Sequence, residues 1–135
     1  MSIDLRAVAL RWFEEVWNQR KEAVIHELMS ADAVCHLDDG PLRGPDEFYA
    51  RQYVPFTSAF STLKVVVEGT VCDGDQVVVR WCATGVHTGD GLGMKATNKP
   101  VTLRGMTWIR MKDGKFHEGW QASNITDVFR SLAAA

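Results

Sequence analysis

Two histidines stand at positions where an imidazole could move a proton. His36 lies in a short β-rich run, 33–37, and the alternation of side chains along a strand places Asp38 on the same side. Because imidazole titrates near neutral pH, His36 could serve as a general base, oriented by Asp38 or Asp39. The alternative is a histidine that is hydrogen-bonded in the wall of a pocket and takes no part in catalysis.

His87 ends a second β-rich run and enters a long loop, 88–100, of the kind that often lies over a site. There it could polarise a substrate carbonyl, although a side chain that stabilises the turn is the favoured interpretation. Arg80 and Arg104 fall inside predicted strands, where a lone charge needs a partner or solvent. For both, an ion pair with Glu68 or Glu118, within the fold or at a dimer interface, is favoured, and a guanidinium fork that binds a substrate carboxylate or enolate is the alternative.

Aromatic side chains form the third candidate group. The chain has five tryptophans and two tyrosines in 135 residues. Most large rings belong to a core, but rings that line a cavity would suit a flat aromatic or polycyclic ligand. We assign such a substrate-binding role to Trp17, Tyr53, Trp108 and Trp120, with Arg104 beside them.

The direction in which Trp120 points depends on the turn at 112–115. A two-residue loop would pair Trp120 with Thr107, whereas a three-residue loop with a bulge would pair it with Met106. The two registers turn opposite faces of the strand inward, and the sequence leaves both open.

Composition indicates a single folded domain, 1–135, with neither nucleic acid nor a membrane as partner. Hydrophobic residues make up 46%, the formal net charge is −2, and Lys and Arg are scattered. Proteins that bind nucleic acid usually carry a basic excess. No apolar run approaches about 20 residues, and the N-terminus lacks the layout of a signal peptide, so we expect a cytoplasmic protein.

The cysteines and the catalytic motifs exclude several kinds of site. Cys35, Cys72 and Cys82 are odd in number and lack CxxC spacing, so they are interpreted as small buried hydrophobes rather than disulfide partners or metal ligands. The sequence contains none of the motifs of nucleotide binding, zinc hydrolysis or serine-hydrolase chemistry.

Helical periodicity covers the first part of the chain and strand periodicity the rest. Apolar residues recur at helical spacing over 5–17 and again over 24–29, and Gly44-Pro45 opens a third helix. Residues 125–135 resemble a loose C-terminal helix or tail. The β-rich runs, joined in part by two Asp-Gly hairpin turns, are 63–71, 76–87, 101–111 and 116–122. We therefore predict an α+β fold in which N-terminal helices pack into a strongly curved antiparallel sheet around a pocket.

Short motifs follow one another in a distinctive order between residues 8 and 125. They are Trp17-Asn18, 32–36, 44–48, 74–77, Arg80-Trp81, 84–89, 98–101, 113–116, Glu118 and Trp120. This order resembles that of the SnoaL-like family of polyketide cyclases, within the ketosteroid-isomerase-like superfamily of cone-shaped folds. The stretch Thr84–Gly89, with the sequence TGVHTG, contributes most to the resemblance.

The resemblance implies a cone-shaped domain that forms a homodimer through the outer face of its sheet and uses no metal or organic cofactor. In the cyclases, an acidic residue just past the final tryptophan acts as general acid/base in an intramolecular aldol ring closure. Here the position four residues after Trp120 is Asn124. An amide forms hydrogen bonds but cannot take and return a proton as a carboxylate does. Acid/base chemistry on this chain therefore needs another group.

Together, the residues and the resemblance predict a cofactor-free cyclase or isomerase that acts on a carbonyl-containing, polyketide-like substrate. His36 would be the general base, and Asn124 and His87 would help to stabilise the enolate. The alternative is a non-catalytic module that binds a small hydrophobic or aromatic carbonyl ligand, and an epoxide or lactone hydrolase has the least support. Whether His36 and Asn124 point into one cavity, within a hydrogen bond or one water of each other, separates the first two hypotheses.

Overall fold

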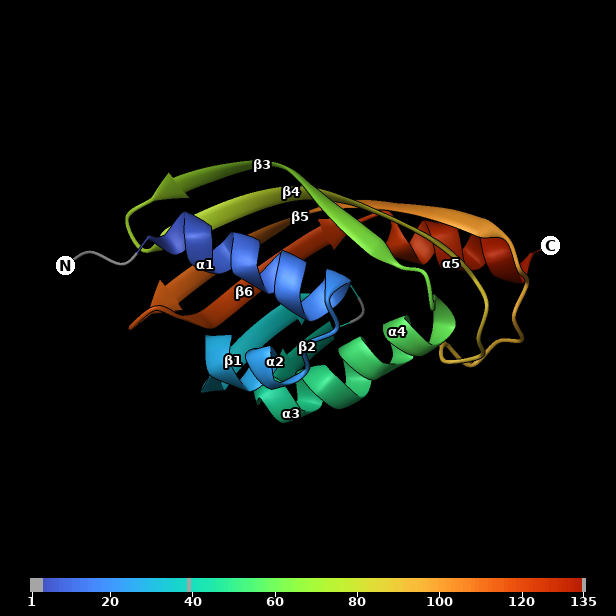
Figure 1. Ribbon diagram of the computed structural model, residues 1–135, viewed down its shortest axis with the longest axis horizontal. Coiled ribbons are helices and arrows are strands. Elements are labelled where there is room, and N and C mark those ends of the chain that lie inside the picture. The colour runs from blue at the N-terminus through green and yellow to red at the C-terminus, as the bar shows by residue number, and fades with distance from the viewer. Residues whose placement is uncertain (1–3, 39, 135) are drawn as a thin grey trace.

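Six strands of the computed structural model form one curved sheet, and helices cover its concave face (Figure 1). The structure describes residues 4–38 and 40–134. The strands are β1 (Met29–Leu37), β2 (Gly40–Arg43), β3 (Lys64–Asp73), β4 (Gln76–Val86), β5 (Pro100–Lys112) and β6 (Lys115–Ser123). The helical segments, in which η denotes π-helical turns, are α1 (Leu5–Arg11), η1 (Trp12–Asn18), α2 (Ala23–Leu28), α3 (Gly44–Phe48), η2 (Tyr49–Tyr53), α4 (Val54–Ala59) and α5 (Ile125–Ala133). This architecture confirms the predicted α+β fold.

One pair of strands in the sheet is parallel. The strand order is β2-β1-β6-β5-β4-β3. Strands β3 to β6 form an antiparallel meander, as predicted, whereas β1 runs parallel to β6 with His36 opposite Trp120. A parallel pair needs a long connection, and here most of the chain lies between the two strands, so no local turn could indicate it. The sheet is therefore mixed, and not wholly antiparallel as predicted.

A bulge in β6 decides which of its side chains face inward. The turn between β5 and β6 is a two-residue loop, Asp113-Gly114, and both residues have positive φ angles as a type I′ turn requires. Past the turn the register shifts by one residue, which leaves His117 as the extra residue of β6. Trp120 consequently pairs with Trp108. Both predicted registers were wrong, because neither placed a bulge inside the strand.

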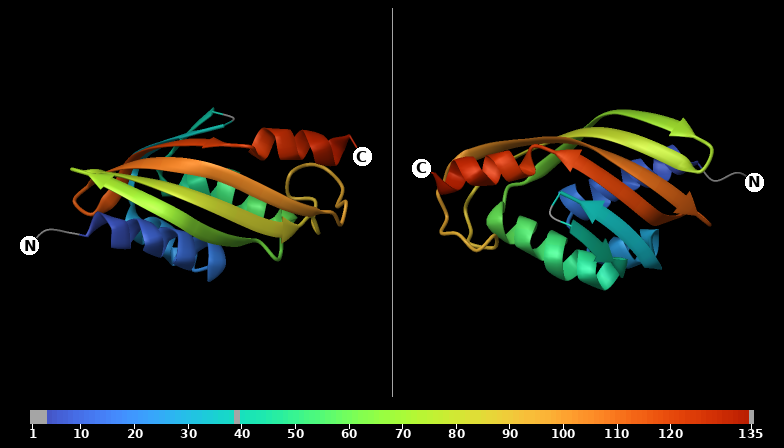
Figure 2. Two further views of the ribbon diagram at one scale, coloured as in Figure 1. Left: turned by 90° about the horizontal axis from the view of Figure 1, so that it is seen from above. Right: turned by 180° about the vertical axis from the view of Figure 1, so that it is seen from behind.

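Side-chain alternation separates an inner face of the sheet from an outer face. On β5, Leu103 and Ile109 are buried toward the helices, whereas Met106 is 52% exposed and Trp108 is 49% exposed. Figure 2 shows α1 and α4 on the same, concave side of the sheet. The core thus fills the space between the sheet and the helices, and apolar side chains are left uncovered on the outer face.

The loop between β4 and β5 and the helix α5 lie at the same end of the molecule (Figure 1). The backbone N–H of His87 donates to the carbonyl of Lys99 at 2.9 Å, which closes the base of the predicted long loop. The N–H of Thr88 donates to the carbonyl of Ala59 at 2.9 Å and ties the loop to the end of α4. Within residues 4–38 and 40–134, no helix combines the length and the apolar composition that a membrane span requires.

Candidate functional site

The sheet and the helices enclose three adjoining cavities of about 60, 50 and 80 Å³. Two side chains line all three cavities, Gln52 from η2 and Gln121 from β6. Gln121 faces inward because the bulge at His117 reverses the alternation of β6 beyond it. The cavities are therefore parts of one interior space, and the two amides lie where they meet.

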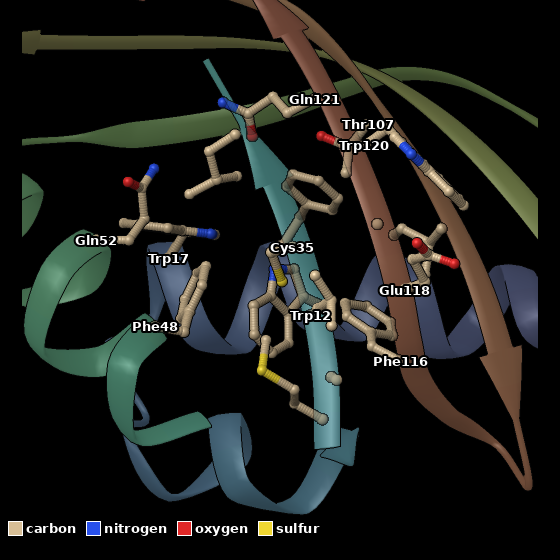
Figure 3. Close-up of a pocket in the computed structure, with 17 residues that line it drawn as sticks. Trp12, Trp17, Cys35, Phe48, Gln52, Thr107, Phe116, Glu118, Trp120 and Gln121 are labelled. Carbon is tan, nitrogen blue, oxygen red and sulfur yellow. The ribbon is translucent and has the colours of Figure 1, made fainter. Parts of the chain in front are cut away.

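The first cavity is the aromatic part of this space (Figure 3). The rings of Trp12, Trp17, Phe48 and Phe116 form much of its wall, and Cys35 enters it from β1. Burial raises the pKa of the Cys35 thiol to about 11, so the sulfur is protonated and a poor nucleophile at neutral pH. This part of the interior is suited to hold hydrocarbon.

The second cavity adds one polar group to the shared amides, the indole N–H of Trp17, which bonds to no other residue in the described part of the chain. Its wall includes Leu63 and Leu103, together with the indole of Trp81. The indole N–H of Trp81 already donates to Oγ1 of Thr107 at 2.9 Å. A ligand in this cavity would thus meet the amides of Gln52 and Gln121 and the indole N–H of Trp17.

The third cavity lies beside the end of β1, between α4 and α5, and it contains a carboxylate. Asp38 lines it together with Thr126 and Phe129 of α5. The Asp38 carboxylate accepts hydrogen bonds from the Ser123 hydroxyl at 2.6 Å, from the Ser123 backbone N–H at 3.3 Å and from Nε2 of Gln121 at 3.3 Å. These bonds fix a group that can accept and return a proton at the mouth of the interior.

Gln52 supplies a free hydrogen-bond donor to the same space. Its side-chain amide bonds to no other residue in the part of the chain that the structure describes. Figure 3 shows Gln52 beside Trp17 at the edge of the first cavity. A carboxylate and an amide donor that face one apolar space are the groups that proton removal next to a carbonyl requires.

The family model of the SnoaL-like polyketide cyclases matches residues 7–132. The chain belongs to the SnoaL-like polyketide cyclase family. No curated protein sequence matches the chain.

Solved structures share the fold of this SnoaL-like chain. A protein from Jannaschia sp. CCS1 that is assigned to the SnoaL-like polyketide cyclases is 25% identical with a TM-score of 0.87, and the match covers 97% of this chain and 92% of that one. IdmH from Streptomyces antibioticus, assigned as a polyketide cyclase, is 22% identical with a TM-score of 0.81 over 97% of this chain and 99% of its own. A protein from Acidithiobacillus ferrooxidans with the same assignment is 23% identical with a TM-score of 0.82 over 100% and 99%.

Asn124, at the position expected for the SnoaL-like acid, is engaged with the backbone of β5. Its Oδ1 accepts from the N–H of Arg104 at 2.8 Å, and its Nδ2 donates to the carbonyl of Thr102 at 3.3 Å. It lines none of the three cavities. The contacts of Asn124 are those of a residue that joins β5 to the start of α5.

His36 faces away from the interior of the SnoaL-like cone. Its neighbours Cys35 and Leu37 line the first cavity, so alternation directs His36 to the outer face. There Nε2 lies 2.9 Å from Oε2 of Glu118, and the ring stacks on Trp120 at 5.6 Å between centroids. His36 and Asn124 therefore share no cavity, and the predicted acid/base pair is not assembled. Asp39, the second residue expected to orient His36, lies outside the described residues.

His87 is fully buried at the base of the loop. The backbone N–H of Thr97 donates to its Nδ1 at 3.2 Å, so the ring proton sits on Nε2. Within the described residues, Nε2 has no hydrogen-bond partner, and the ring packs against Phe60 at 5.6 Å. His87 lines none of the three cavities, and its contacts hold the loop in place.

The predicted substrate-binding aromatics divide between the two faces. Trp17 lines the first two cavities, and Tyr53 is buried behind it with the ring centroids 5.5 Å apart. Burial raises the pKa of the Tyr53 hydroxyl. Trp108 lies on the outer face, where its indole N–H donates to Gln76 at 2.5 Å. Trp120 borders the first cavity, but Figure 3 shows its indole directed away from the cavity's aromatic wall.

Arg104 is exposed on the outer face and does not reach the interior. Glu68 lies 3.7 Å from Arg80, which confirms an ion pair for that arginine, whereas Glu118 lies 3.4 Å from Arg110 and not beside Arg104. An enolate or carboxylate in the cavities would therefore not meet the guanidinium of Arg104.

Sequence reasoning missed Asp38, Gln52 and Gln121 as the polar groups of the interior. Asp38 was considered only as a partner of His36, since alternation was extended past the end of β1, where the chain in fact turns. Gln121 faces inward through a bulge that no turn residue indicates. Helical spacing from the predicted inward residues could have found Gln52, which lies one turn after the buried Phe48.

Within residues 4–38 and 40–134, no group of three or more His, Cys, Asp and Glu side chains is arranged to bind a metal ion.

Proposed function

We propose that this chain is a cofactor-free enzyme of the cyclase or isomerase kind, in which Asp38 moves a proton at a carbon beside a carbonyl group. One observation carries the proposal: the Asp38 carboxylate stands at the mouth of an apolar interior, held there by Ser123 and Gln121. Membership of the SnoaL-like polyketide cyclase family supports an enzyme of this kind. In this proposal Asp38 replaces His36 as the general base.

In the proposed reaction, Gln52 donates a hydrogen bond to the substrate carbonyl while Asp38 removes a proton from the adjacent carbon. The electron pair of the broken C–H bond moves into the enolate, and its oxygen gains charge beside the Gln52 amide. For ring closure, the enolate carbon attacks a second carbonyl carbon of the same molecule and forms one C–C bond. The new alkoxide takes the proton back from Asp38, which regenerates the carboxylate. In an isomerase the proton would instead return to a different carbon.

Deuterium incorporation from solvent tests this role of Asp38. NMR would follow exchange of the C–H beside the carbonyl in a panel of small ketones and keto-esters. We expect Asp38→Asn, which keeps the size and an acceptor for Ser123, to lower the enzyme-dependent rate by about 100-fold or more. His36→Gln is the matched control and should exchange at the wild-type rate. Exchange by Asp38→Asn at the wild-type rate would remove Asp38 from the mechanism.

A non-catalytic ligand-binding module is the second candidate, and the composition of the third cavity favours it. Asp38 is the one titratable side chain among the described residues that line this cavity, and three donors already engage it. A binding module needs no second acid/base group. Ligands that raise the melting temperature of the protein without any enzyme-dependent exchange would support this candidate over the enzyme.

We also propose that a second copy of the chain covers the outer face of the sheet. Val66, Met106 and Trp108 lie on that face and are each about half exposed or more. Large apolar side chains gathered on one face are typical of a surface that a partner buries. The SnoaL-like resemblance supports a homodimer of this geometry.

A further inference from the structure

The geometry points to a compact, uncharged substrate, either a short open-chain or a single-ring carbonyl compound, and not a fused polycycle. This inference rests on the proposed function insofar as the ligand is taken to carry an enolisable carbonyl group.

The interior is small for a ligand site. Its three parts measure about 60, 50 and 80 Å³. Sites for drug-sized ligands usually measure roughly 300–1,000 Å³. Even taken together, the three parts fall short of the lower limit, so a fused ring system has no room beside the two glutamines.

Rings in mutual contact prevent the aromatic end from widening. Trp12 packs on Phe116 and on Phe48, with centroids 4.7 and 5.2 Å apart, and Phe48 packs on Trp17 at 6.1 Å. All four rings are buried. In a close-packed interior, the shift of one ring displaces the others, so a larger ligand would have to rebuild the whole wall.

At the opposite end of the interior, beside the third cavity, helix α5 limits the space for a ligand. Phe129 of α5 packs on Phe56 and Phe60, with centroids 5.6 and 6.4 Å apart. Asp38 and Gln52 lie along the space between this cluster and the aromatic end. A substrate carbonyl that meets Gln52 therefore leaves room for only a few carbon atoms on either side.

The charges along the walls favour a neutral ligand. Neither Lys nor Arg occurs among the described residues that line the three cavities, whereas Asp38 contributes a carboxylate to the third cavity and Glu118 borders the first. An anionic substrate would leave water for an apolar space with a negative charge at its mouth and no cation to pair with. A free carboxylate or phosphate on the substrate is thus disfavoured.

Calorimetric binding of three probes to the wild-type protein tests both parts of the inference. Ethyl acetoacetate is small and neutral, acetoacetate is its charged counterpart, and anthrone is a neutral fused tricycle. We expect ethyl acetoacetate to bind about tenfold more tightly than either of the others, because anthrone would overpack the interior and acetoacetate would bring an unpaired charge into it. Anthrone or acetoacetate that binds as tightly as ethyl acetoacetate overturns the inference, and so does the absence of saturable binding by all three.

Variants show whether the aromatic wall sets the size limit. Phe48→Ala should open the aromatic end and admit anthrone, whereas Trp108→Ala, which removes a ring from the outer face, should not. Phe48→Leu is the milder variant if Phe48→Ala does not fold, and it should shift the preference in the same direction. Failure of a folded Phe48 variant to gain any affinity for anthrone counts against the inference.

The binding experiment tests the size limit, and the exchange experiment tests the catalytic role of Asp38, so either proposal can be rejected without the other. Selective binding without Asp38-dependent exchange would keep the size limit and reject the catalytic proposal. Asp38-dependent exchange into anthrone would keep the catalytic proposal and reject the size limit.

Discussion

The oxygen and the nitrogen of the Asn124 side-chain amide both bond to the backbone of β5. Its Oδ1 accepts from the N–H of Arg104, and its Nδ2 donates to the carbonyl of Thr102. In Asn124→Asp, a carboxylate would keep the first bond but would set a negative charge against the Thr102 oxygen. We expect a loss of about 1–3 kcal/mol in the free energy of unfolding, measured by urea denaturation.

The same variant tests whether the acid position of the family is still in use. Because Asn124 lines none of the cavities, Asn124→Asp should not raise the rate of deuterium exchange into any ketone of the panel. A clear increase would mean that a substrate reaches position 124.

Cys35 links the first cavity to the pH dependence of stability. Burial raises the pKa of its thiol from 9.0 to about 11. Between these values the unfolded chain has lost this proton while the folded chain keeps it, so the free energy of unfolding falls as the pH rises through this range. Cys35→Ala should show a shallower fall in denaturation experiments between pH 9 and 11. The exposed Cys72→Ala variant is the control, and a Cys35→Ala curve parallel to wild type would exclude the effect.

At the scale of the elements, local signals predicted the fold well and the site poorly. The Asp-Gly turns and the alternating runs predicted β3 to β6 to within a few residues, since a hairpin is encoded by neighbouring residues. The parallel contact of β1 with β6 joins segments far apart in the sequence, and this contact brings Ser123 and Gln121 to Asp38. Of the predicted site residues, Trp17 lines the cavities, as its place on the apolar stripe of the first helix indicated. His36, in contrast, faces outward.

The bulge at His117 is the element on which the site depends most. It places Gln121 on the inner face and Trp120 on the outer face. Insertion of one alanine after His117 would move the rest of β6 by one residue and exchange these faces, so a polar site residue would be replaced inside by an indole. We expect loss of the cooperative thermal transition or, if the chain folds, loss of ligand binding. Insertion of one alanine after the exposed Lys95 in the long loop is the control and should leave both nearly unchanged. A variant with the insertion after His117 that binds like wild type would show that the register adapts.

At the scale of the whole molecule, the two faces of the sheet have different uses. The inner face and the helices enclose the cavities, and the outer face presents apolar side chains beside the stacked pair of His36 and Trp120. Because successive residues of a strand point to opposite faces, a residue that serves the site cannot also serve the outer surface. Three residues that were predicted to line the pocket, Trp108, Trp120 and Arg104, therefore belong to the outer surface of the sheet.

The proposed homodimer predicts that one charge on the outer face separates the subunits. Met106 is 52% exposed near the middle of β5, and burying a carboxylate there without a partner costs far more than a single contact contributes. We expect the wild-type protein to elute as a dimer and Met106→Glu as a monomer in size-exclusion chromatography with light scattering. Val54→Glu is the matched control, because Val54 is 36% exposed on α4, which lies on the concave side of the sheet, and this variant should stay dimeric. A wild-type protein that is monomeric at all concentrations, or a Met106→Glu variant that remains dimeric, would place the interface elsewhere or remove it.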